Sequence, residues 1–381
     1  MYINFWYPMA RIEELTDKPM KVGALGQDFV LFRDENGDAA CISNTCTHRG
    51  GSLSGGKIKG NCIECPYHGW QFDADGNVHR VPSLGNNARI PGRTRIDAYP
   101  VEEKFGLILA FLGDLPEDQR PPVIDVAEWD QDGWRPTIQD YTLKANYERS
   151  VENGIDPAHN EFVHDTHGFE GEDEEYKVDA MRIVEPSGWG KGFWHDFNAP
   201  SLTDDNQMKD TRPDSGKLEV GTGFHGPNQV WTYIHLSDEA WIHQYLMERP
   251  IDDSSTHIYL VCMRNSFLKP AMDQNVIDRN QYVADQDVKI IENLNPALTP
   301  PTNTREFMTP SDKCILMYRE ALKEWDANGW RIDTDAVAQN RRNVAYAVPG
   351  PARRQQKGWV LDSIPLLGAE DAAKPKLKAT G

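Results

Sequence analysis

Between residues 20 and 113, apolar and polar residues alternate in short runs, and each run ends at a segment typical of turns. The alternation from Asp28 to Phe32 leads into the turn sequence 34–38, and further turns are indicated at Lys59-Gly60 and at 73–77. The apolar run 106–112 closes the pattern as a strand. A period of two is typical of strands with one buried face. The pattern therefore predicts an antiparallel β module.

A polar, proline-bearing stretch at 113–122 interrupts this pattern and has the composition of an exposed connection. Beyond it lie helix candidates at 144–164, 271–295 and 311–328, and strand candidates at 178–198, 217–235, 240–249 and 256–265. Because these elements lack regular βαβ alternation, we expect an α+β fold. We place the domains at 1–115 and 123–368 and a frayed tail at 369–381. The acidic run 170–175 is expected to be a solvated loop.

Composition and charge exclude several classes of protein. The 381 residues include 40 basic and 59 acidic ones, and the formal net charge of −19 would repel nucleic acid and anionic membranes. No stretch approaches the roughly 18 apolar residues of a membrane span, and the N-terminus lacks the pattern of a signal peptide. The six cysteines are too few and too unevenly placed for a secreted disulfide scaffold, which favours the reducing cytoplasm.

Two cysteine–histidine pairs stand close together in the predicted β module. Cys46 and His48 form a C-x-H pair, Cys65 and His68 form a C-x2-H pair, and glycines follow both. Two thiolates can hold one iron of a sulfide-bridged cluster while two neutral imidazoles hold the other and raise its potential. Neighbouring glycines let backbone N–H groups approach the sulfurs. The pattern predicts a Rieske [2Fe–2S] cluster.

A structural zinc site is the alternative for this constellation, because two cysteines and two histidines also suit tetrahedral zinc. A zinc finger, however, usually carries its cysteines together and its histidines together, whereas here each segment supplies one of each. Cys41 and Cys62 fall in strand candidates, and we interpret them as small buried side chains rather than ligands.

A second candidate centre follows at His159 and His164, five residues apart, with Asp156 three residues before the first. At about 100° per residue, a five-residue step in a regular helix leaves two side chains roughly 140° apart. Both imidazoles can reach one metal only if the helix is interrupted or contains a π-type turn. Gly154 and Pro157 favour such an irregularity. His167 is an alternative to His164 as the second ligand.

An Fe(II) that activates O2 needs one carboxylate in addition to two histidines. In the helix candidate 271–295, Asp287 shares a face with four apolar residues, so its charge points toward the core. Metal binding would offset the cost of burying it, and an ion pair with an arginine such as Arg149 is the alternative. Asp285 falls on a polar face and is expected to be solvated. The apolar residues sharing the face of Asp287 are Val283, Ile290, Ile291 and Leu294.

Several histidines occur among aromatic residues in the later strand candidates. Such a set is more often core than pocket, although some members can line a cavity for an apolar substrate. These residues are His235, His243 and His257, with Trp231, Tyr233, Trp241 and Tyr245.

With these motifs in hand, the chain resembles the Rieske non-haem iron oxygenases along nearly its whole length. Asp156, His159 and His164 match the family's D-x2-H-x4-H pattern, and the segment 285–292 is similar to the helix that carries the third ligand, Asp287. Within the family, the chain is most similar to the single-subunit branch. That branch includes carbazole dioxygenase, O-demethylases, ketosteroid hydroxylases and saxitoxin hydroxylases, the last through the segment 309–319.

The resemblance implies a Rieske β domain, a helix-grip catalytic domain and a homotrimer in which electrons pass between chains. It implies that Asp156 bridges the cluster ligand His68 of one chain and the iron ligand His159 of its neighbour. It also implies that Asn153 lies close to the iron. The expected cofactors are a [2Fe–2S] cluster and a mononuclear Fe(II).

The leading hypothesis is thus a terminal oxygenase that hydroxylates or oxidatively demethylates a small aromatic or alicyclic molecule. The chain contains neither a nucleotide-binding G-x-G-x-x-G motif after a strand nor a plant-type ferredoxin motif, so electrons from NAD(P)H would arrive through a separate reductase or ferredoxin. A Rieske electron carrier or redox sensor is the alternative. The roughly 260 residues beyond the β module argue against it, because a carrier would need only the module. A zinc protein with a small-molecule domain is a third.

Overall fold

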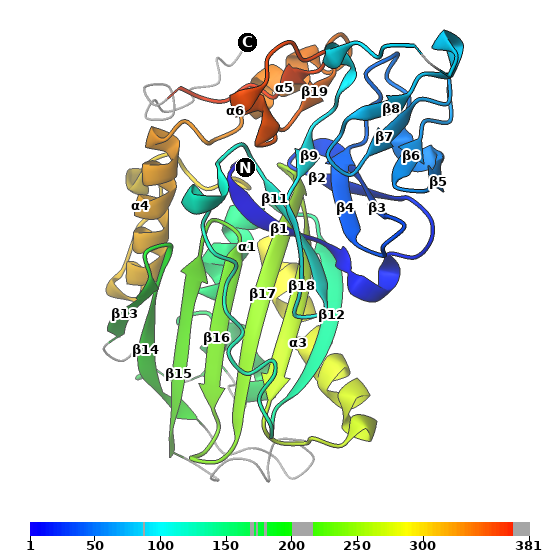
Figure 1. Cartoon of the computed structure of the whole chain (residues 1–381). Coiled ribbons are helices and arrows are strands. Elements are labelled where there is room, and N and C mark those ends of the chain that lie inside the picture. The colour runs from blue at the N-terminus through cyan, green and yellow to red at the C-terminus, as the bar shows by residue number, and fades with distance from the viewer. Residues whose placement is uncertain (87, 168–170, 173, 179–180, 200–215, 369–381) are drawn as a thin grey trace. The chain divides into compact units, whose positions relative to one another are not determined.

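The computed structural model describes residues 1–86, 88–167, 171–172, 174–178, 181–199 and 216–368. These residues form two compact units (Figure 1). Unit 1 contains residues 1–123, 249–253 and 325–368, and unit 2 contains the described parts of 124–248 and 254–324. The predicted tail 369–381 and part of the acidic run 170–175 lie outside the described residues.

Most strands described in unit 1 belong to three small antiparallel sheets. Their strand orders are β1-β11-β10, β2-β3-β4-β9 and β5-β6-β7-β8. The strands are β1 (Phe5–Arg11), β2 (Met20–Ala24), β3 (Gln27–Arg33), β4 (Ala39–Ser43), β5 (Lys57–Lys59), β6 (Cys62–Glu64), β7 (Gln71–Asp73), β8 (Val78–Arg80), β9 (Ala98–Tyr99), β10 (Val101–Lys104) and β11 (Leu107–Leu112). The predicted antiparallel β module is confirmed.

The predicted turns join these strands for the expected physical reason. Asp34 Oδ1 accepts hydrogen bonds from the backbone N–H groups of Asn36 and Asp38, and Gly37 supplies a positive φ of 88° between β3 and β4. Asp73 makes the same contacts to residues 75 and 77 between β7 and β8. Both are Asx-type turns, which an aspartate two residues before the bend stabilises.

The C-terminal segment 325–368 belongs to unit 1. This corrects the prediction, which placed all of 123–368 in the second domain. The segment contains α5 (Thr334–Asn340), α6 (Ala352–Gln355) and a short parallel pair, β19 (Tyr346–Ala347) with β20 (Asp362–Ser363). Asp97 is fully buried, and Arg353 donates to both of its carboxylate oxygens, at 2.6 and 2.7 Å. The Tyr99 hydroxyl donates to Val348 O. These long-range contacts tie the segment to β9.

Unit 2 is a seven-stranded antiparallel sheet with helices. The strand order is β12-β18-β17-β16-β15-β14-β13. The strands are β12 (Arg135–Leu143), β13 (Arg182–Ser187), β14 (Gly190–Ala199), β15 (Gly216–His225), β16 (Gln229–His235), β17 (Trp241–Asp252) and β18 (Ser255–Arg264). The helices are α1 (Tyr147–Gly154), α2 (Asn160–Val163), α3 (Asp273–Ile291) and α4 (Lys313–Ala327).

Helices α1 and α3 lie against the same face of the large sheet (Figure 1). The α1 helix packs on β15 and β16, and α3 packs on β12. On α4, Tyr318 packs edge-on against Phe224 of β15, and Arg319 donates to Glu152 of α1. Side chains of alternate strand positions therefore face the space between sheet and helices. The predicted α+β class, with a β domain followed by a helix-on-sheet domain, is confirmed.

The predicted helices and strands of unit 2 are helices and strands in the structure, but several of their bounds need correction. The strand candidates 178–198 and 217–235 are each a hairpin of two strands, and the helix candidate 144–164 is two helices. Strand β12 has no counterpart among the predicted strands. None of the helices in the described parts is both long and apolar enough to cross a membrane.

Candidate metal centres

Two similar loops carry the cysteine–histidine pairs. One follows β4 and the other follows β6, and each turns back through a hydrogen bond between residues four apart. Gly50 N donates to Cys46 O at 2.9 Å, and Gly69 N donates to Cys65 O at 3.0 Å. Both glycines have φ near +70°, a conformation that side chains rarely tolerate. The repeated C…G spacing thus folds into two equivalent ligand loops.

The loops bring like ligands together. His48 Nδ1 lies 3.1 Å from His68 Nδ1, and the Cys46 and Cys65 thiols lie within hydrogen-bonding reach of each other. Among the described residues, however, no three of these four ligand atoms lie within 4.8 Å of one another. One zinc ion would bind all four at 2.0–2.3 Å and so would draw them to a single point. Two separated pairs suit a two-iron cluster with two thiolates on one iron and two imidazoles on the other.

The surroundings of the cysteines also fit a cluster. Both thiols are almost fully buried, and the backbone N–H groups of His48 and Arg49 point at the Cys46 sulfur. A Cβ on Gly51 would lie 3.0 Å from the Cys65 sulfur, so a side chain at this position would crowd the ligand. Burial raises the pKa of the Cys46 thiol to about 12, so a positive metal centre is needed to hold it as a thiolate.

The second centre begins where α1 ends. The Asn146 side chain caps the start of α1 by accepting from Glu148 N, and α1 ends at Gly154, where a Cβ would lie 3.1 Å from Val230. The chain resumes a helix only at α2, so His159 precedes α2 and His164 follows it. Their Nε2 atoms are 3.2 Å apart. The predicted interruption is confirmed.

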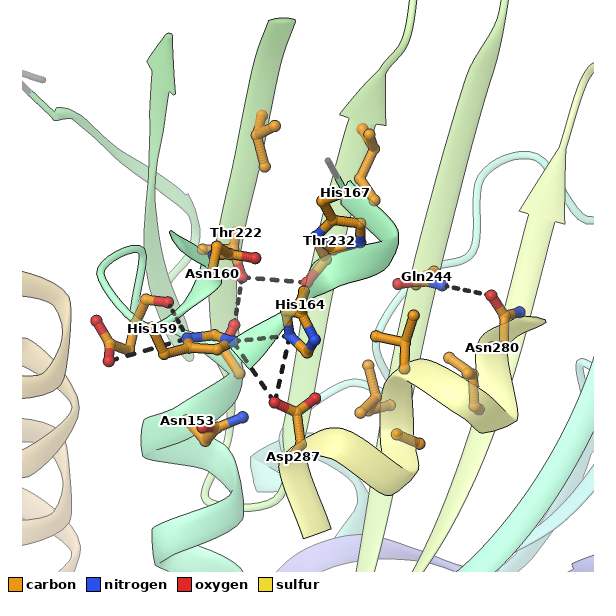
Figure 2. Close-up of a pocket in the computed structure, with 18 of the residues that line it drawn as sticks. Asn153, His159, Asn160, His164, His167, Thr222, Thr232, Gln244, Asn280 and Asp287 are labelled. Atoms are coloured by element: carbon orange, nitrogen blue, oxygen red, sulfur yellow. Dashed lines mark hydrogen bonds and ion pairs between the residues drawn. The ribbon is translucent and has the colours of Figure 1, made fainter. Parts of the chain in front are cut away.

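Asp287 on α3 completes a group of three. Its Oδ1 lies 3.6 Å from His159 Nε2 and 3.3 Å from His164 Nε2, and one ligand atom from each residue lies within 4.8 Å of the others. Figure 2 shows the three side chains pointing toward one another. No other such group occurs among the described residues. Two imidazoles and one carboxylate gathered on one side of a point are the donor set of a facial iron triad, so these residues fit a mononuclear Fe(II).

The geometry favours neither of the alternatives considered for this centre. Arg149 donates to Glu152 and Glu306 rather than to Asp287. The His167 ring lies near the His164 ring, with centroids 4.9 Å apart and planes tilted by 59°, but His167 is not part of the group of three. The prediction that Asp287 shares a buried apolar face is only partly confirmed, because Ile291 is buried while Ile290 and Leu294 are exposed. Asp285 is exposed, as predicted.

Hydrogen-bond partners orient the two imidazoles. One of these partners, Gln286, was not identified from the sequence. His159 Nδ1 lies 2.8 Å from Asp156 O, and His164 Nδ1 lies 3.1 Å from Gln286 Oε1. Gln286 in turn donates to Asp165 at 2.7 Å. Such outer contacts fix the tautomer of a metal-binding histidine. The available signal was the position of Gln286 directly before Asp287.

Burial and charge set the protonation of the triad. Burial lowers the pKa of His159 and favours the neutral imidazole, which is the form that binds metal. For His164, burial also opposes the charge, but the Asp287 carboxylate outweighs it and raises the pKa. The pKa of Asp156 is raised, chiefly by burial. Asn153 projects from α1 beside the triad (Figure 2).

An apolar cavity of about 190 Å³ adjoins the triad, between α1, α3 and the sheet. Its walls are mainly aliphatic side chains from alternate positions of β15 to β18. A few polar groups interrupt them, and Gln244 Nε2 donates to Asn280 Oδ1 at 3.2 Å on one wall (Figure 2). The other polar groups in the wall include His195, Thr222 and Thr232.

Two family models match the chain in succession. Residues 5–100 match the Rieske [2Fe-2S] domain, and residues 143–328 match the vanillate O-demethylase oxygenase C-terminal domain. The first range contains both ligand loops, and the second contains the triad. The chain belongs to the Rieske non-haem iron oxygenase family. Because this family combines a [2Fe–2S] cluster with a mononuclear iron, the predicted cofactors are confirmed, while the residues that hold them stay predictions.

Sequence relatives of this Rieske oxygenase include methylxanthine N1-demethylase NdmA of Pseudomonas putida, which is 26% identical over 84% of this chain and 88% of that protein. The oxygenase subunit of tert-butanol monooxygenase / tert-amyl alcohol desaturase of Aquincola tertiaricarbonis is 34% identical over 42% of this chain and 34% of the relative. Five of the curated relatives are matched over only 34 to 43% of their own length.

Solved structures show the same fold as this Rieske oxygenase. NdmA of Pseudomonas putida CBB5 with caffeine has a TM-score of 0.68 and 23% identity, covering 85% of this chain and 91% of that one. Dicamba monooxygenase bound to dicamba has a TM-score of 0.67 and 21% identity, covering 84% and 96%. At these identities the likeness concerns the architecture and not the substrate.

The aromatic set of this Rieske oxygenase lies on the sheet face opposite the cavity. Tyr233 stacks on His243 at 4.1 Å, and the buried Glu128 lies 2.6 Å from His243 Nδ1 and accepts from Tyr245. The cavity is lined instead by the intervening residues, such as Ile234 and Gln244. None of the set lines the cavity, as expected. The expectation that the set is core is confirmed only for Trp231, His243 and Tyr245, because its other members are half-buried.

Proposed function

We propose that this chain is the terminal oxygenase component of a Rieske oxygenase system, which hydroxylates or oxidatively demethylates a small aromatic or alicyclic molecule. The observation that carries the proposal is a triad that lines a largely apolar cavity. The match of residues 143–328 to an oxygenase domain supports this function over that of an electron carrier. Electrons from NAD(P)H would arrive through a separate reductase or ferredoxin.

Each site residue has a proposed role. Cys46, Cys65, His48 and His68 hold the cluster, and the triad holds the iron. When bound, the cluster supplies single electrons and the Fe(II) supplies open coordination positions for O2. The protein's part is to keep His159 neutral, to orient His164 through Gln286 and to surround the site with apolar side chains that exclude water.

Asp156 and Asn153 are proposed to act beside the iron. Asp156 is partly exposed, with 23% of its side-chain surface accessible, and the His68 ring is exposed in unit 1. An accessible carboxylate and an accessible imidazole can meet between neighbouring chains, which supports a bridge from His68 through Asp156 to His159 in a homotrimer. Asn153 lines the cavity and can hydrogen-bond to a group bound at the iron.

The cavity supports a compact, mostly apolar substrate with one polar group. Aliphatic walls favour ring carbons, and the Gln244–Asn280 amide pair offers a polar contact that an entirely apolar molecule would leave unused. Similarity to a methylxanthine N1-demethylase supports oxidative demethylation among the possible outcomes. The charge of −19 argues against nucleic acid and anionic membranes as partners, and the six free cysteines support a location in the reducing cytoplasm.

The test is product formation in labelled oxygen. The protein with both metal centres filled is reduced, mixed with ¹⁸O2 and a panel of small aromatic and alicyclic compounds, and the products are analysed by mass. Label in a hydroxylated product, or demethylation that depends on reduced protein, supports the proposal. Reoxidation of the cluster with no product from any class, together with an empty triad after Fe(II) is supplied, would leave the electron-carrier function in its place.

A further inference from the structure

A fully buried carboxylate, Glu248, stands apart from the metal centres. It lies near the end of β17 and has no exposed surface. Neither of its oxygens has a hydrogen-bond partner of regular geometry among the described residues. An ionised carboxylate in such a place would be costly, by several kcal/mol in order of magnitude, whereas the protonated acid is neutral. The site therefore favours a carboxyl group that keeps its proton.

The position of Glu248 follows from the alternation of β17. Ile242, Gln244 and Leu246 line the cavity, so Glu248 is the next residue on the same face. It lies just beyond the cavity wall, because it is not itself among the lining residues. The carboxyl group thus lies outside the cavity lining rather than in contact with a substrate.

Helix α1 supplies the link between this carboxyl group and the cavity. The Ser150 hydroxyl is a hydrogen-bonding group for Glu248, and Ser150 also lines the cavity. Asn153, one turn further along the same face of α1, lines the cavity beside the triad. A path of polar groups therefore runs from Glu248 through Ser150 toward Asn153 and the metal centre.

The groups that face Glu248 leave its proton in place near neutral pH. On α1 the neighbouring group is Ser150. The charge of Glu248 also acts on Tyr141 of β12, whose own pKa is raised mainly by burial and then by Glu248 and Asp287. Burial raises the pKa of Glu248 to about 8, and Ser150 opposes this rise. Within the described residues, no cation or second carboxylate has a resolved effect on it.

We propose that Glu248 is the internal proton donor of the active site and passes its proton to the cavity through the Ser150 hydroxyl. The inference rests on the proposed function, because an oxygenase that inserts one oxygen atom consumes O2, two electrons and two protons per product and releases the other atom as water. Electrons come from the reductase. Ser150 accepts the Glu248 proton on Oγ as its own proton leaves into the cavity, so Glu248 supplies one of the two protons and bulk solvent supplies the other. A second solvent proton, relayed by water in the cavity and by Ser150, later restores the carboxyl group of Glu248.

The first test reads the proton directly and needs no turnover. Infrared difference spectra of the intact protein in H2O and D2O near neutral pH should show the carbonyl band of a protonated carboxyl group, shifted by deuterium. Glu248→Gln should remove this band and leave the secondary structure unchanged, because the amide has the shape of the neutral acid. A wild-type protein without such a band, or a band that persists in the variant, would contradict the proposal.

The second test reads the role in turnover. Glu248→Gln should lower product formation about 100-fold, the usual size of an acid–base contribution. The variant should also show a weaker dependence of the rate of product formation on pH, and it should release more peroxide per O2 consumed. Both metal centres should stay filled. Ser150→Ala should reproduce these effects, and Ser150→Thr, which keeps a hydroxyl, should restore most of the rate and of the pH profile.

The outcomes separate this inference from the proposed function. A Glu248→Gln protein with the wild-type rate and pH profile contradicts only the proton-donor role. A wild-type protein that makes no oxygenated product with both centres filled contradicts the proposed function, and the delivery role with it.

Discussion

The two metal centres of this chain are built in opposite ways. The cluster ligands come from residues 46–68, in two loops of equal design whose imidazoles are exposed. The triad joins a broken helix at 159–164 to residue 287 on another helix, beside a buried cavity. The first site is therefore a local arrangement that its own turns preserve, whereas the second depends on how the helices of unit 2 pack against the sheet.

Loss of a cluster thiolate should have the largest effect. Cys65→Ser removes one of the two soft ligands, so we expect loss of acid-labile sulfide and of the red-brown colour, and no product formation, because electrons cannot reach the iron. Cys62→Ser is the matched control, since Cys62 is also buried but lies in β6 outside the ligand loop. It should keep its sulfide. Equal sulfide content in both variants would remove Cys65 from the ligand set.

Loss of the carboxylate should separate the two centres. In Asp287→Asn the anionic oxygen is replaced, so we expect the mononuclear iron to be lost, the cluster to remain and product formation to fall by at least about 100-fold. Asp285→Asn, two residues away and exposed, should keep wild-type iron and activity. Iron analysis and visible spectra measure both. The assignment fails if the two variants hold the same iron.

A smaller effect is expected where a residue only orients a ligand. Gln286→Leu removes the acceptor beside His164 Nδ1, so the Fe(II) dissociation constant should rise by about 10- to 100-fold with the cluster unchanged. Gln281→Leu on the same helix is the control, because Gln281 contacts Gln139 and Asp285 rather than a ligand. Titration of iron-depleted protein with Fe(II) gives both constants, and equal values would assign Gln286 no orienting role.

The last effect concerns stability rather than metal binding or product formation, and it depends on pH because Glu248 is buried. Glu248 has a pKa of about 8 in the folded chain against 4.5 for a free carboxyl group. Between these values the unfolded chain has released a proton that the folded chain retains, so the free energy of unfolding should fall by about 1.4 kcal/mol per pH unit as pH rises. Below 4.5 the penalty is absent, and above 8 it is constant.

Glu248→Gln should lack this slope. Urea unfolding of wild type and variant at two pH values inside the window should give a difference in stability that grows with pH. A constant difference would mean that Glu248 is ionised in the folded chain.

The contrast between the sites also explains what the sequence could predict. The cluster loops and the broken helix at His159 were predictable because their ligands, turn glycines and Pro157 are neighbours in the chain. Asp287 was reached through helix periodicity, although only part of its expected apolar face is buried. Local spacing limits the geometry of such segments directly.

Features that depend on distant segments were not predictable. Whether Gln244 or His243 faces the cavity depends on strand register, and a shift of one residue would exchange them. The C-terminal segment joins unit 1 through the Asp97–Arg353 ion pair, which joins residues 256 positions apart. Gln286 acquires its contact to His164 only once α3 has packed beside the broken helix.

The central claim is that two separable metal centres exist on one chain. Iron and acid-labile sulfide should be measured per chain on anaerobically purified wild type and His159→Ala, each supplied with Fe(II). We expect about three irons and two sulfides in wild type, and about two irons with two sulfides in the variant. Wild type that holds only the cluster's two irons, or a variant that keeps the third, would contradict the claim.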